Sequence, residues 1–246
     1  MNSFPLIALN EIDSTNNYTK ALLMGKEVNE FTVVTSEYQL AGKGQRGNYW
    51  ESERGKNLTF SVILKPSFLA INKQFMLSKI VCLAMHQTLS RYIENPHLKI
   101  KWPNDIYYKD FKIAGILIEH DLLGNQIESS IVGIGLNVNQ TSFISDAPNP
   151  ISLNNICRQT FDKSEILNYY INSLKSYYRL LKNREWEQIN ARYHQILYRN
   201  QEQHIYEDNN GRFIGKIRSV DEDGTINIEK ENKVAQYLFK EVKYII

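Results

Sequence analysis

The sequence predicts an α+β fold in which helices flank a mixed or antiparallel sheet, followed by a small β-barrel. Short strand-like runs follow one another between residues 98 and 138, as in a meander, so adjacent antiparallel pairing is expected. Apolar side chains recur at helical spacing in residues 73–93 and 164–181. From about residue 200 the chain alternates short strands with turns, which indicates a separate small β domain.

The first elements can be assigned from caps and turns. Residues 13–16, Asp-Ser-Thr-Asn, offer several N-cap residues, and Gly25 is typical of the position just beyond a helix, so a helix is expected over residues 17–24. Strand-like runs at 31–35 and 58–64 flank a glycine-rich loop. Further strands are expected at 98–102, 106–108, 112–119 and 130–138, and further helices at 73–93, 164–181 and 185–197.

Length and charge limit the class of protein. The 246 residues suffice for one large domain with a small appendage, which we place at residues 1–198 and 199–246. Roughly 45 residues of strand and turn would be marginally stable alone, so the small domain is expected to pack on the large one. The formal charge of +2 argues against a concentrated nucleic-acid-binding face.

The sequence contains no signal for secretion or for a membrane span. No basic and apolar leader pattern opens the chain, and no apolar run approaches the length of a membrane helix. Cys82 and Cys157 lie far apart, and no Cys or His cluster has metal-ligand spacing. We therefore expect two reduced thiols in a cytoplasmic protein, and no metal site formed by protein side chains alone.

The loop at residues 42–47 spells Gly-Lys-Gly-Gln-Arg-Gly, the letters of a dinucleotide-binding fingerprint. That fingerprint requires a helix directly after the glycines. Residues 48–55 are instead polar and turn-like and lead to a second strand, so a dinucleotide-dependent oxidoreductase is not supported. Lys43 and Arg46 can neutralise a phosphate or a carboxylate. The pattern favours a basic loop that wraps around a small anionic ligand.

Other segments carry side chains suited to a binding site. Residues 14–16, Ser-Thr-Asn, either cap a helix or border a ligand. Residues 101–105, Lys-Trp-Pro-Asn-Asp, end a strand with an amide and a carboxylate; the alternative is a structural turn with its tryptophan in the core. Lys112 opens an apolar strand that contains Gly115, so the lysine either meets an anion in a semi-buried pocket or extends to solvent. Residues 133–139 add two glycines and two amides.

The order and spacing of these segments resemble the bacterial biotin protein ligases, also called biotin–[acetyl-CoA-carboxylase] ligases. The resemblance covers essentially the whole chain and rests on residues 13–16, 37–50, 101–105, 112–117 and 133–137. It implies a catalytic ligase domain at 1–198, of the class II aminoacyl-tRNA synthetase and biotin synthetase type, and an SH3-like domain at 199–246. Because the Ser-Thr-Asn block begins at residue 14, we expect the ligase-only form without an N-terminal DNA-binding domain.

The activity of such ligases has two steps. They activate biotin with Mg²⁺ and ATP to give biotinyl-5′-adenylate, and then transfer the biotinyl group to one lysine of a carrier. The resemblance thus implies biotin and ATP as ligands, with Mg²⁺ carried by ATP, and a biotin carboxyl carrier protein domain as partner. No nucleic acid or membrane partner is expected, and a homodimer through an exposed sheet edge is consistent with the family.

The resemblance also implies which residues form the site. Contacts to biotin are implied for Ser14, Thr15, Asn16, Gln39, Gly42, Lys43, Gly44, Gln45, Lys112 and Gly115. Contacts to ATP or the adenylate are implied for Lys43, Arg46, Trp50, Lys101, Asn104 and Asn137. Catalytic roles are implied for Lys112, Arg46 and Asp105. Lys112 would contact the carboxylate or acyl-phosphate oxygen, and Asp105 would help to place Mg²⁺ or orient the incoming lysine.

The glycine loop departs from the family pattern, Gly-Arg-Gly-Arg-Arg-Gly-Arg. Lys43, Gln45 and Asn48 stand where the family has arginine. Lysine keeps the charge but loses the bidentate fork, and the two amides carry no charge. We expect Arg46 to take over part of the phosphate contact. A lipoate or octanoate ligase of the same fold and a non-catalytic biotin-binding module are the alternative functions.

Overall fold

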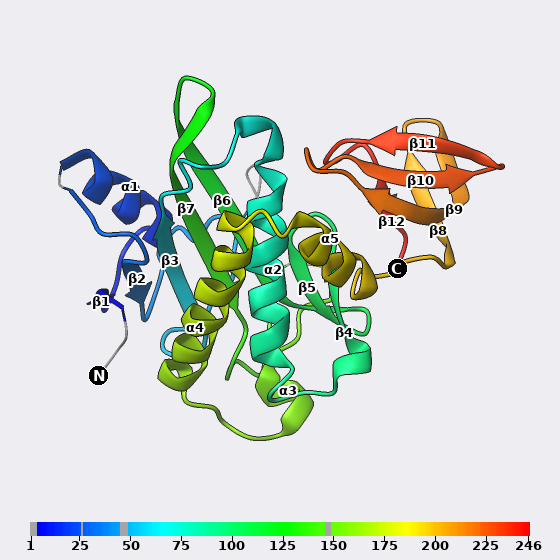
Figure 1. Cartoon of the computed structure of the whole chain (residues 1–246). Coiled ribbons are helices and arrows are strands. Elements are labelled where there is room, and N and C mark those ends of the chain that lie inside the picture. The colour runs from blue at the N-terminus through cyan, green and yellow to red at the C-terminus, as the bar shows by residue number, and fades with distance from the viewer. Residues whose placement is uncertain (1–3, 26, 45–48, 146–148) are drawn as a thin grey trace.

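The structure is a computed structural model that describes residues 4–25, 27–44, 49–145 and 149–246 (Figure 1). Its centre is a seven-stranded sheet with the strand order β1-β2-β3-β7-β6-β5-β4. The strands are β1 (Leu6–Leu9), β2 (Val33–Ser36), β3 (Leu58–Leu64), β4 (Leu98–Lys101), β5 (Asp105–Tyr108), β6 (Phe111–Leu123) and β7 (Gln126–Leu136).

The expected meander is confirmed, since β4, β5, β6 and β7 pair with their sequence neighbours in antiparallel fashion. The sheet is mixed because β1 pairs with β2 in parallel. Strand β1 was not expected from the sequence: it has only four residues, half of them exposed. Its place in the sheet therefore depends on pairing with β2 rather than on a strong local pattern.

Helices α2 (Phe75–Leu89) and α4 (Lys163–Lys182) lie across one face of the sheet (Figure 1). Nearly every residue of α2 is buried, so this helix lies between the sheet and its neighbours. Helix α4 instead has one apolar stripe, which includes Tyr170, and the Tyr170 ring meets Phe60 of β3 edge-on at 5.4 Å. These contacts form the main core of the protein.

The remaining helices are shorter. Helix α1 begins at Thr15, two residues earlier than expected, so Thr15 and Asn16 lie in its first turn and are buried. The expected helix at 185–197 is confirmed, whereas the one at 153–157 was not expected. The other helices are α1 (Thr15–Gly25), α3 (Leu153–Cys157) and α5 (Trp186–Gln195), with short 3-10 turns η2 (Ile71–Lys73) and η3 (Asn95–His97).

The C-terminal part forms a second, five-stranded antiparallel sheet with the order β11-β10-β9-β8-β12. Its strands are β8 (Gln203–Asp208), β9 (Gly211–Val220), β10 (Ile226–Lys230), β11 (Lys233–Tyr237) and β12 (Lys243–Tyr244). This arrangement agrees with the expected small SH3-like domain. The boundary at 198/199 falls in the connection between α5 and β8 and stays a prediction.

The turn between β9 and β10 attaches the C-terminal sheet to the large domain. Lys79 of α2 is fully buried, and its Nζ donates to the carbonyl of Val220 at 2.9 Å. Trp102 Nε1 donates to the carbonyl of Gly224 at 2.9 Å. The ring of Phe75 packs closely against Gly224: a Cβ added to Gly224 would lie 2.8 Å from Phe75 Cδ2. The two sheets are therefore joined by specific contacts.

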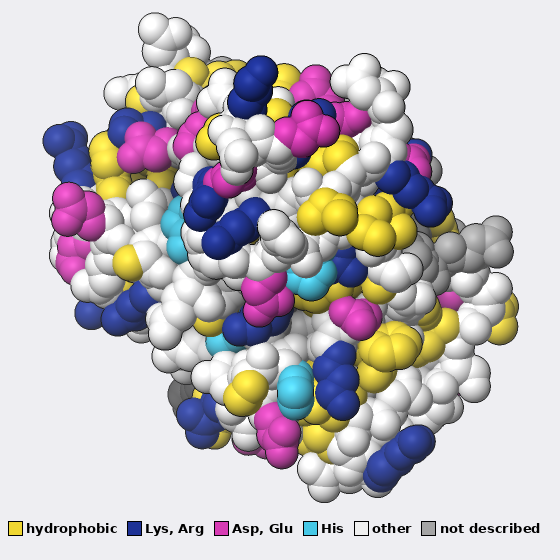
Figure 2. Space-filling model, turned by 90° about the vertical axis from the view of Figure 1, so that its right-hand side faces the viewer, with side chains coloured by type: hydrophobic (Ala, Val, Ile, Leu, Met, Phe, Trp, Pro, Cys, Tyr) yellow, Lys and Arg dark blue, Asp and Glu magenta, His cyan; other side chains and the backbone are white. Residues whose placement is uncertain are grey.

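The described surface gives no sign of a dedicated basic face on the side shown in Figure 2, where Lys and Arg side chains are interspersed with Asp and Glu. Among the described residues, no helix is both long and apolar enough to cross a bilayer. Cys82 is buried, Cys157 is partly buried, and both are free thiols.

Candidate functional site

The site lies on the sheet face opposite α4. Phe60 points toward α4, so the neighbouring residues Thr59 and Ser61 point to the other face, because side chains alternate along a strand. The strand register then aligns a row of residues across five strands on that face. In order from β4 to β3, the row is Lys101, Asp105, Gly115, Gly135 and Thr59.

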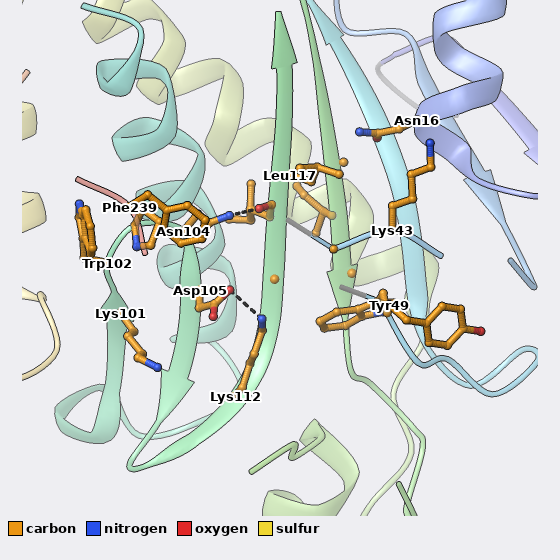
Figure 3. Close-up of a pocket in the computed structure, with 18 of the residues that line it drawn as sticks. Asn16, Lys43, Tyr49, Lys101, Trp102, Asn104, Asp105, Lys112, Leu117 and Phe239 are labelled. Atoms are coloured by element: carbon orange, nitrogen blue, oxygen red, sulfur yellow. Dashed lines mark hydrogen bonds and ion pairs between the residues drawn. The ribbon is translucent and has the colours of Figure 1, made fainter. Parts of the chain in front are cut away.

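A cavity of about 640 Å³ opens above this row (Figure 3). Most of the residues implied by the resemblance line it, although they come from five separate segments. They are Ser14, Thr15, Asn16, Gln39, Lys43, Gly44, Trp50, Lys101, Asn104, Asp105, Lys112 and Gly115. Folding has thus brought together residues up to about a hundred positions apart.

Four of the implied residues are not seen in the lining. Gln45 and Arg46 lie outside the described residues. Gly42 lies behind the lining. A Cβ at this position would be 2.7 Å from the Trp50 carbonyl oxygen, so the absence of a side chain lets the backbone at residue 42 approach the backbone at residue 50. Asn137 follows β7 and donates to the backbone carbonyl of Ile151 at 3.1 Å. Its placement indicates a role in holding residue 151 rather than in lining this cavity.

Cationic side chains gather at one end of the cavity. Lys112 Nζ and Asp105 Oδ1 form an ion pair at 2.8 Å, and both side chains are about one-quarter exposed. Lys101 Nζ donates to the hydroxyl of Tyr107 at 3.0 Å and lies 5.1 Å from the ring centre of Tyr244. Two ammonium groups thus flank one carboxylate, which leaves a net positive charge for an anionic ligand.

The environment of Lys101 lowers its pKa from 10.5 to about 8. Burial is the main cause, because a desolvated ammonium is less stable than a neutral amine. Lys112 and Arg199 lower the pKa further, while the carboxylate of Asp105 raises it. Lys101 is therefore a cation whose charge can be lost within the pH range of ordinary assays.

The indole of Trp50 covers the middle of the cavity floor. A Cβ on Gly135 would lie 2.2 Å from Trp50 Cε2, and one on Gly115 would lie 3.0 Å from Trp50 Cζ3. The two paired glycines therefore make room for the indole. The resemblance implies a biotin contact for Gly115, and in this structure the tryptophan occupies the space against it. Its Nε1 is buried and has no hydrogen-bond partner among the described residues.

Polar side chains of α1, together with Gln39, form the other end of the cavity, and Ser61 of β3 contacts them from behind the lining. Gln39 Oε1 accepts from the backbone N–H of Thr15 at 2.8 Å and from its hydroxyl at 3.1 Å. Ser61 Oγ lies 2.6 Å from Asn16 Oδ1. Asn16 Nδ2 donates to Glu119 Oε2 at 2.7 Å. This end offers directional hydrogen bonds within a largely buried network.

Lys43 lies toward the same polar end, near Asn16 (Figure 3), where its Nζ donates to Asn17 Oδ1 at 2.7 Å. It therefore does not join Lys101 and Lys112 in this arrangement. Asn104 lies near the opposite side, and its Nδ2 donates to the backbone carbonyl of Ile116.

The C-terminal segment supplies part of the cavity wall, which the sequence analysis did not predict. The ring of Phe239 meets Trp102 edge-on, with centroids 6.3 Å apart. Five residues of this segment line the cavity, namely Phe239, Lys240, Val242, Lys243 and Tyr244. The sequence carried one weak signal for them, the SH3-like domain that the resemblance implies at residues 199–246.

The fold and the site together define a class of protein whose cavity is cationic at one end and rich in directional polar groups at the other. A family model described as the biotin/lipoate A/B protein ligase family matches residues 8–137, which is more than half of the chain. The protein belongs to the biotin/lipoate A/B protein ligase family, and it is an enzyme of the ligase class.

Individual relatives agree with this assignment. The Bifunctional ligase/repressor BirA of Bacillus subtilis is 26% identical over 224 residues, covering 89% of this chain and 68% of its own. The biotin–[acetyl-CoA-carboxylase] ligase of Paracoccus denitrificans is 34% identical over 127 residues, which is 51% of each chain. The solved biotin protein ligase of Aquifex aeolicus, in complex with biotin and ATP, is 25% identical, with a TM-score of 0.81 over 98% of this chain and 99% of its own.

Proposed function

We propose that the protein activates biotin with ATP to give biotinyl-5′-AMP and transfers the biotinyl group to a lysine of a biotin carboxyl carrier protein. The observation that carries this proposal is the single cavity that unites the cationic end, Lys101 and Lys112, with the polar end, Thr15, Asn16 and Gln39. A solved relative of nearly identical extent was obtained with biotin and ATP, which supports the same choice of ligands.

The cationic end suits the first step of the reaction. An oxygen of the biotin carboxylate attacks the α-phosphorus of ATP, and the bond from that phosphorus to the bridging oxygen breaks, releasing pyrophosphate. Two anions must approach each other in this step, so Lys112 and Lys101 would offset their repulsion and the charge that develops on the phosphoryl oxygens. The ion pair with Asp105 holds the Lys112 ammonium in place over the sheet.

The second step consumes the adenylate. The amine of the carrier lysine attacks the acyl carbon, the bond from that carbon to the phosphate oxygen breaks, AMP leaves, and the amine loses a proton. Asp105 is the carboxylate at this end of the cavity and would orient the incoming amine. Its exposure of about one-quarter leaves it accessible to a second substrate.

Mg²⁺ would enter with the ATP phosphates. Among the described residues, no cluster of three or more His, Cys, Asp or Glu side chains forms a protein site for a metal ion. Mg²⁺ usually keeps several waters and takes one or two carboxylates together with substrate phosphates. A lone carboxylate, Asp105, fits that pattern, and the metal would supply charge neutralisation of the phosphates.

The direct test is to incubate the purified protein with biotin, Mg-ATP and a carrier domain and to measure covalent biotin by mass spectrometry. We expect a mass increase of one biotinyl group on one carrier lysine. Biotin-dependent exchange of pyrophosphate into ATP should accompany it, with lipoate and octanoate far less effective. Exchange supported better by lipoate would favour the lipoate ligase, and tight biotin binding without exchange would favour a binding module.

A further inference from the structure

Two primary amides at the polar end of the cavity are each oriented by a partner that has a single hydrogen-bonding role. The backbone N–H of Thr15 can only donate, and it bonds Gln39 Oε1, so the Nε2 of Gln39 faces away from it. A carboxylate can only accept, and Glu119 Oε2 accepts from Asn16 Nδ2 at 2.7 Å. Glu119 therefore determines which end of the Asn16 amide is the nitrogen.

Glu119 has this position because of the strand on which it lies. Side chains at every second position of β6 share one face of the sheet, and Gly115 and Leu117 on that face both line the cavity. Glu119 is the next residue on the same face, just beyond the lining. In Figure 3 the amide nitrogen of Asn16 points toward the strand that carries Leu117, in agreement with this contact.

The carbonyl oxygen of Asn16 is correspondingly confined. It lies 2.6 Å from Ser61 Oγ, and a Cβ on Gly133 would be only 2.3 Å from it. Gly133 and Asn16 both line the cavity, whereas Glu119 and Ser61 do not. The oxygen thus rests on the cavity floor, and a carbonyl oxygen accepting one hydrogen bond has a second acceptor position.

Ser61 Oγ bonds both Asn16 Oδ1 and Thr15 Oγ1, and Thr15 bonds Gln39, so the two amides belong to one hydrogen-bonded network. We propose that Glu119 is a positioning residue that sets the substrate specificity of this site by holding Asn16 as an acceptor in the same network as the donor Gln39. An acceptor and a donor at one end of a cavity complement a ring that carries an N–H next to a carbonyl, as a cyclic urea does. A dithiolane ring or an alkyl chain offers neither group and would leave both amides unpaired, which is the usual source of strong discrimination. This inference rests on the proposed function and explains how the site selects biotin.

The test compares Glu119→Ala with Glu119→Gln in the biotin-dependent exchange of pyrophosphate into ATP. Without the carboxylate the Asn16 amide is free to turn, so Glu119→Ala should raise the KM for biotin about tenfold, as expected for one charge-assisted hydrogen bond that is partly solvated. The KM for ATP should stay unchanged. Glu119→Gln keeps an acceptor oxygen and should restore the KM for biotin to within about threefold of the wild-type value.

A matched control removes a carboxylate two positions along the same strand. Asp121 accepts from Ser129 Oγ at 3.1 Å and does not touch Asn16, so Asp121→Ala should leave the KM for biotin unchanged. A double variant shows whether Glu119 acts through Asn16: once Asn16→Ala is present, adding Glu119→Ala should change the KM for biotin no further.

Each result decides the question. Three results would overturn the role of Glu119 while leaving the proposed function intact. The first is an unchanged KM for biotin in Glu119→Ala, and the second is an equal rise in the KM for ATP in that variant. The third is additivity, in which Glu119→Ala raises the KM for biotin as much in the Asn16→Ala background as in the wild type. A wild-type protein that shows no biotin-dependent exchange would instead refute the proposed function, and this inference with it.

Discussion

Lys101 is a cavity residue whose charge depends on its surroundings. Burial lowers its pKa to about 8, so the ammonium is present below that pH and is lost as the pH rises through it. If this cation attracts the phosphates of ATP, kcat/KM for ATP should fall as the pH rises from 7 to 9.5, with an apparent pKa near 8. Pyrophosphate exchange at saturating biotin measures this profile, since kcat/KM reports the free enzyme.

Arginine stays charged throughout that range. Lys101→Arg should therefore abolish the alkaline fall in kcat/KM or move it to higher pH, even if the absolute rate is lower. The same alkaline fall in Lys101→Arg would show that another group titrates, and Lys101 would then have no electrostatic role in ATP binding.

Lys112 differs from Lys101 because it is paired with a carboxylate. Lys112→Ala removes the cation that would stabilise charge during adenylation, so kcat for exchange should fall about 10²–10³-fold. The fold should persist, because Lys112 lies at the start of β6 and is about one-quarter exposed. Circular dichroism and a melting curve check folding alongside the kinetics.

The matched control for Lys112 is Lys109→Ala, which removes an exposed cation from the nearby turn between β5 and β6. It should leave kcat unchanged. Wild-type exchange rates in Lys112→Ala would remove Lys112 from the mechanism.

At the scale of elements, β6 and β7 form the cavity floor because they present paired glycines, Gly115 and Gly135, on one face. Gly135→Ala would place a Cβ 2.2 Å from the Trp50 indole, whereas Gly115→Ala would place one at 3.0 Å. The indole must leave the floor in the first variant and need only shift in the second. Gly135→Ala should therefore cost about 1–3 kcal/mol of stability, the usual effect of overpacking, and Gly115→Ala less.

The free energy of unfolding in urea, measured for both variants, checks this order, and Trp50→Ala provides the control. In the Trp50→Ala background, where the indole is absent, Gly135→Ala should no longer lower the free energy of unfolding. An undiminished cost would mean that the glycine is required by the strand itself rather than by Trp50.

At the scale of the whole molecule, the C-terminal sheet completes the site, and its attachment to the large domain should therefore control activity. Lys79 Nζ bonds the carbonyl of Val220 and Asn190 Oδ1, each at 2.9 Å, and so joins α2, α5 and β9. Lys79→Met keeps the aliphatic chain but leaves both acceptors without this donor. We expect the free energy that docks the C-terminal sheet onto the large domain to weaken by about 1–3 kcal/mol. The KM for ATP should rise as a consequence.

Limited proteolysis of the connection between α5 and β8 would report the docking, and pyrophosphate exchange would report the KM. Lys73→Met is the matched control: it removes a partly exposed ion pair with Glu222 from the same turn, and such pairs contribute little. Equal protease resistance in wild type and Lys79→Met would show that Lys79 does not hold the domains together.

Much of the architecture followed from local patterns in the sequence. Two-residue alternation and turn residues predicted the meander, and helical spacing predicted α2, α4 and α5, because these signals depend on neighbours along the chain. The segment from Lys101 to Asp105 and the segment that begins at Lys112 lie together at one end of the cavity, because the hairpins that join them are short and local.

Contacts between distant segments were decided only by the tertiary structure. The pairing of β1 with β2, the indole of Trp50 on the two glycines, and the contact of Glu119 with Asn16 each join residues at least 27 positions apart. The entry of residues 239–244 into the cavity depends on how the second sheet docks. The sequence by itself determined most of the elements and the chemical groups available, because propensity and periodicity act over a few residues. Which of those groups meet was settled by packing and strand register, which act across the whole fold.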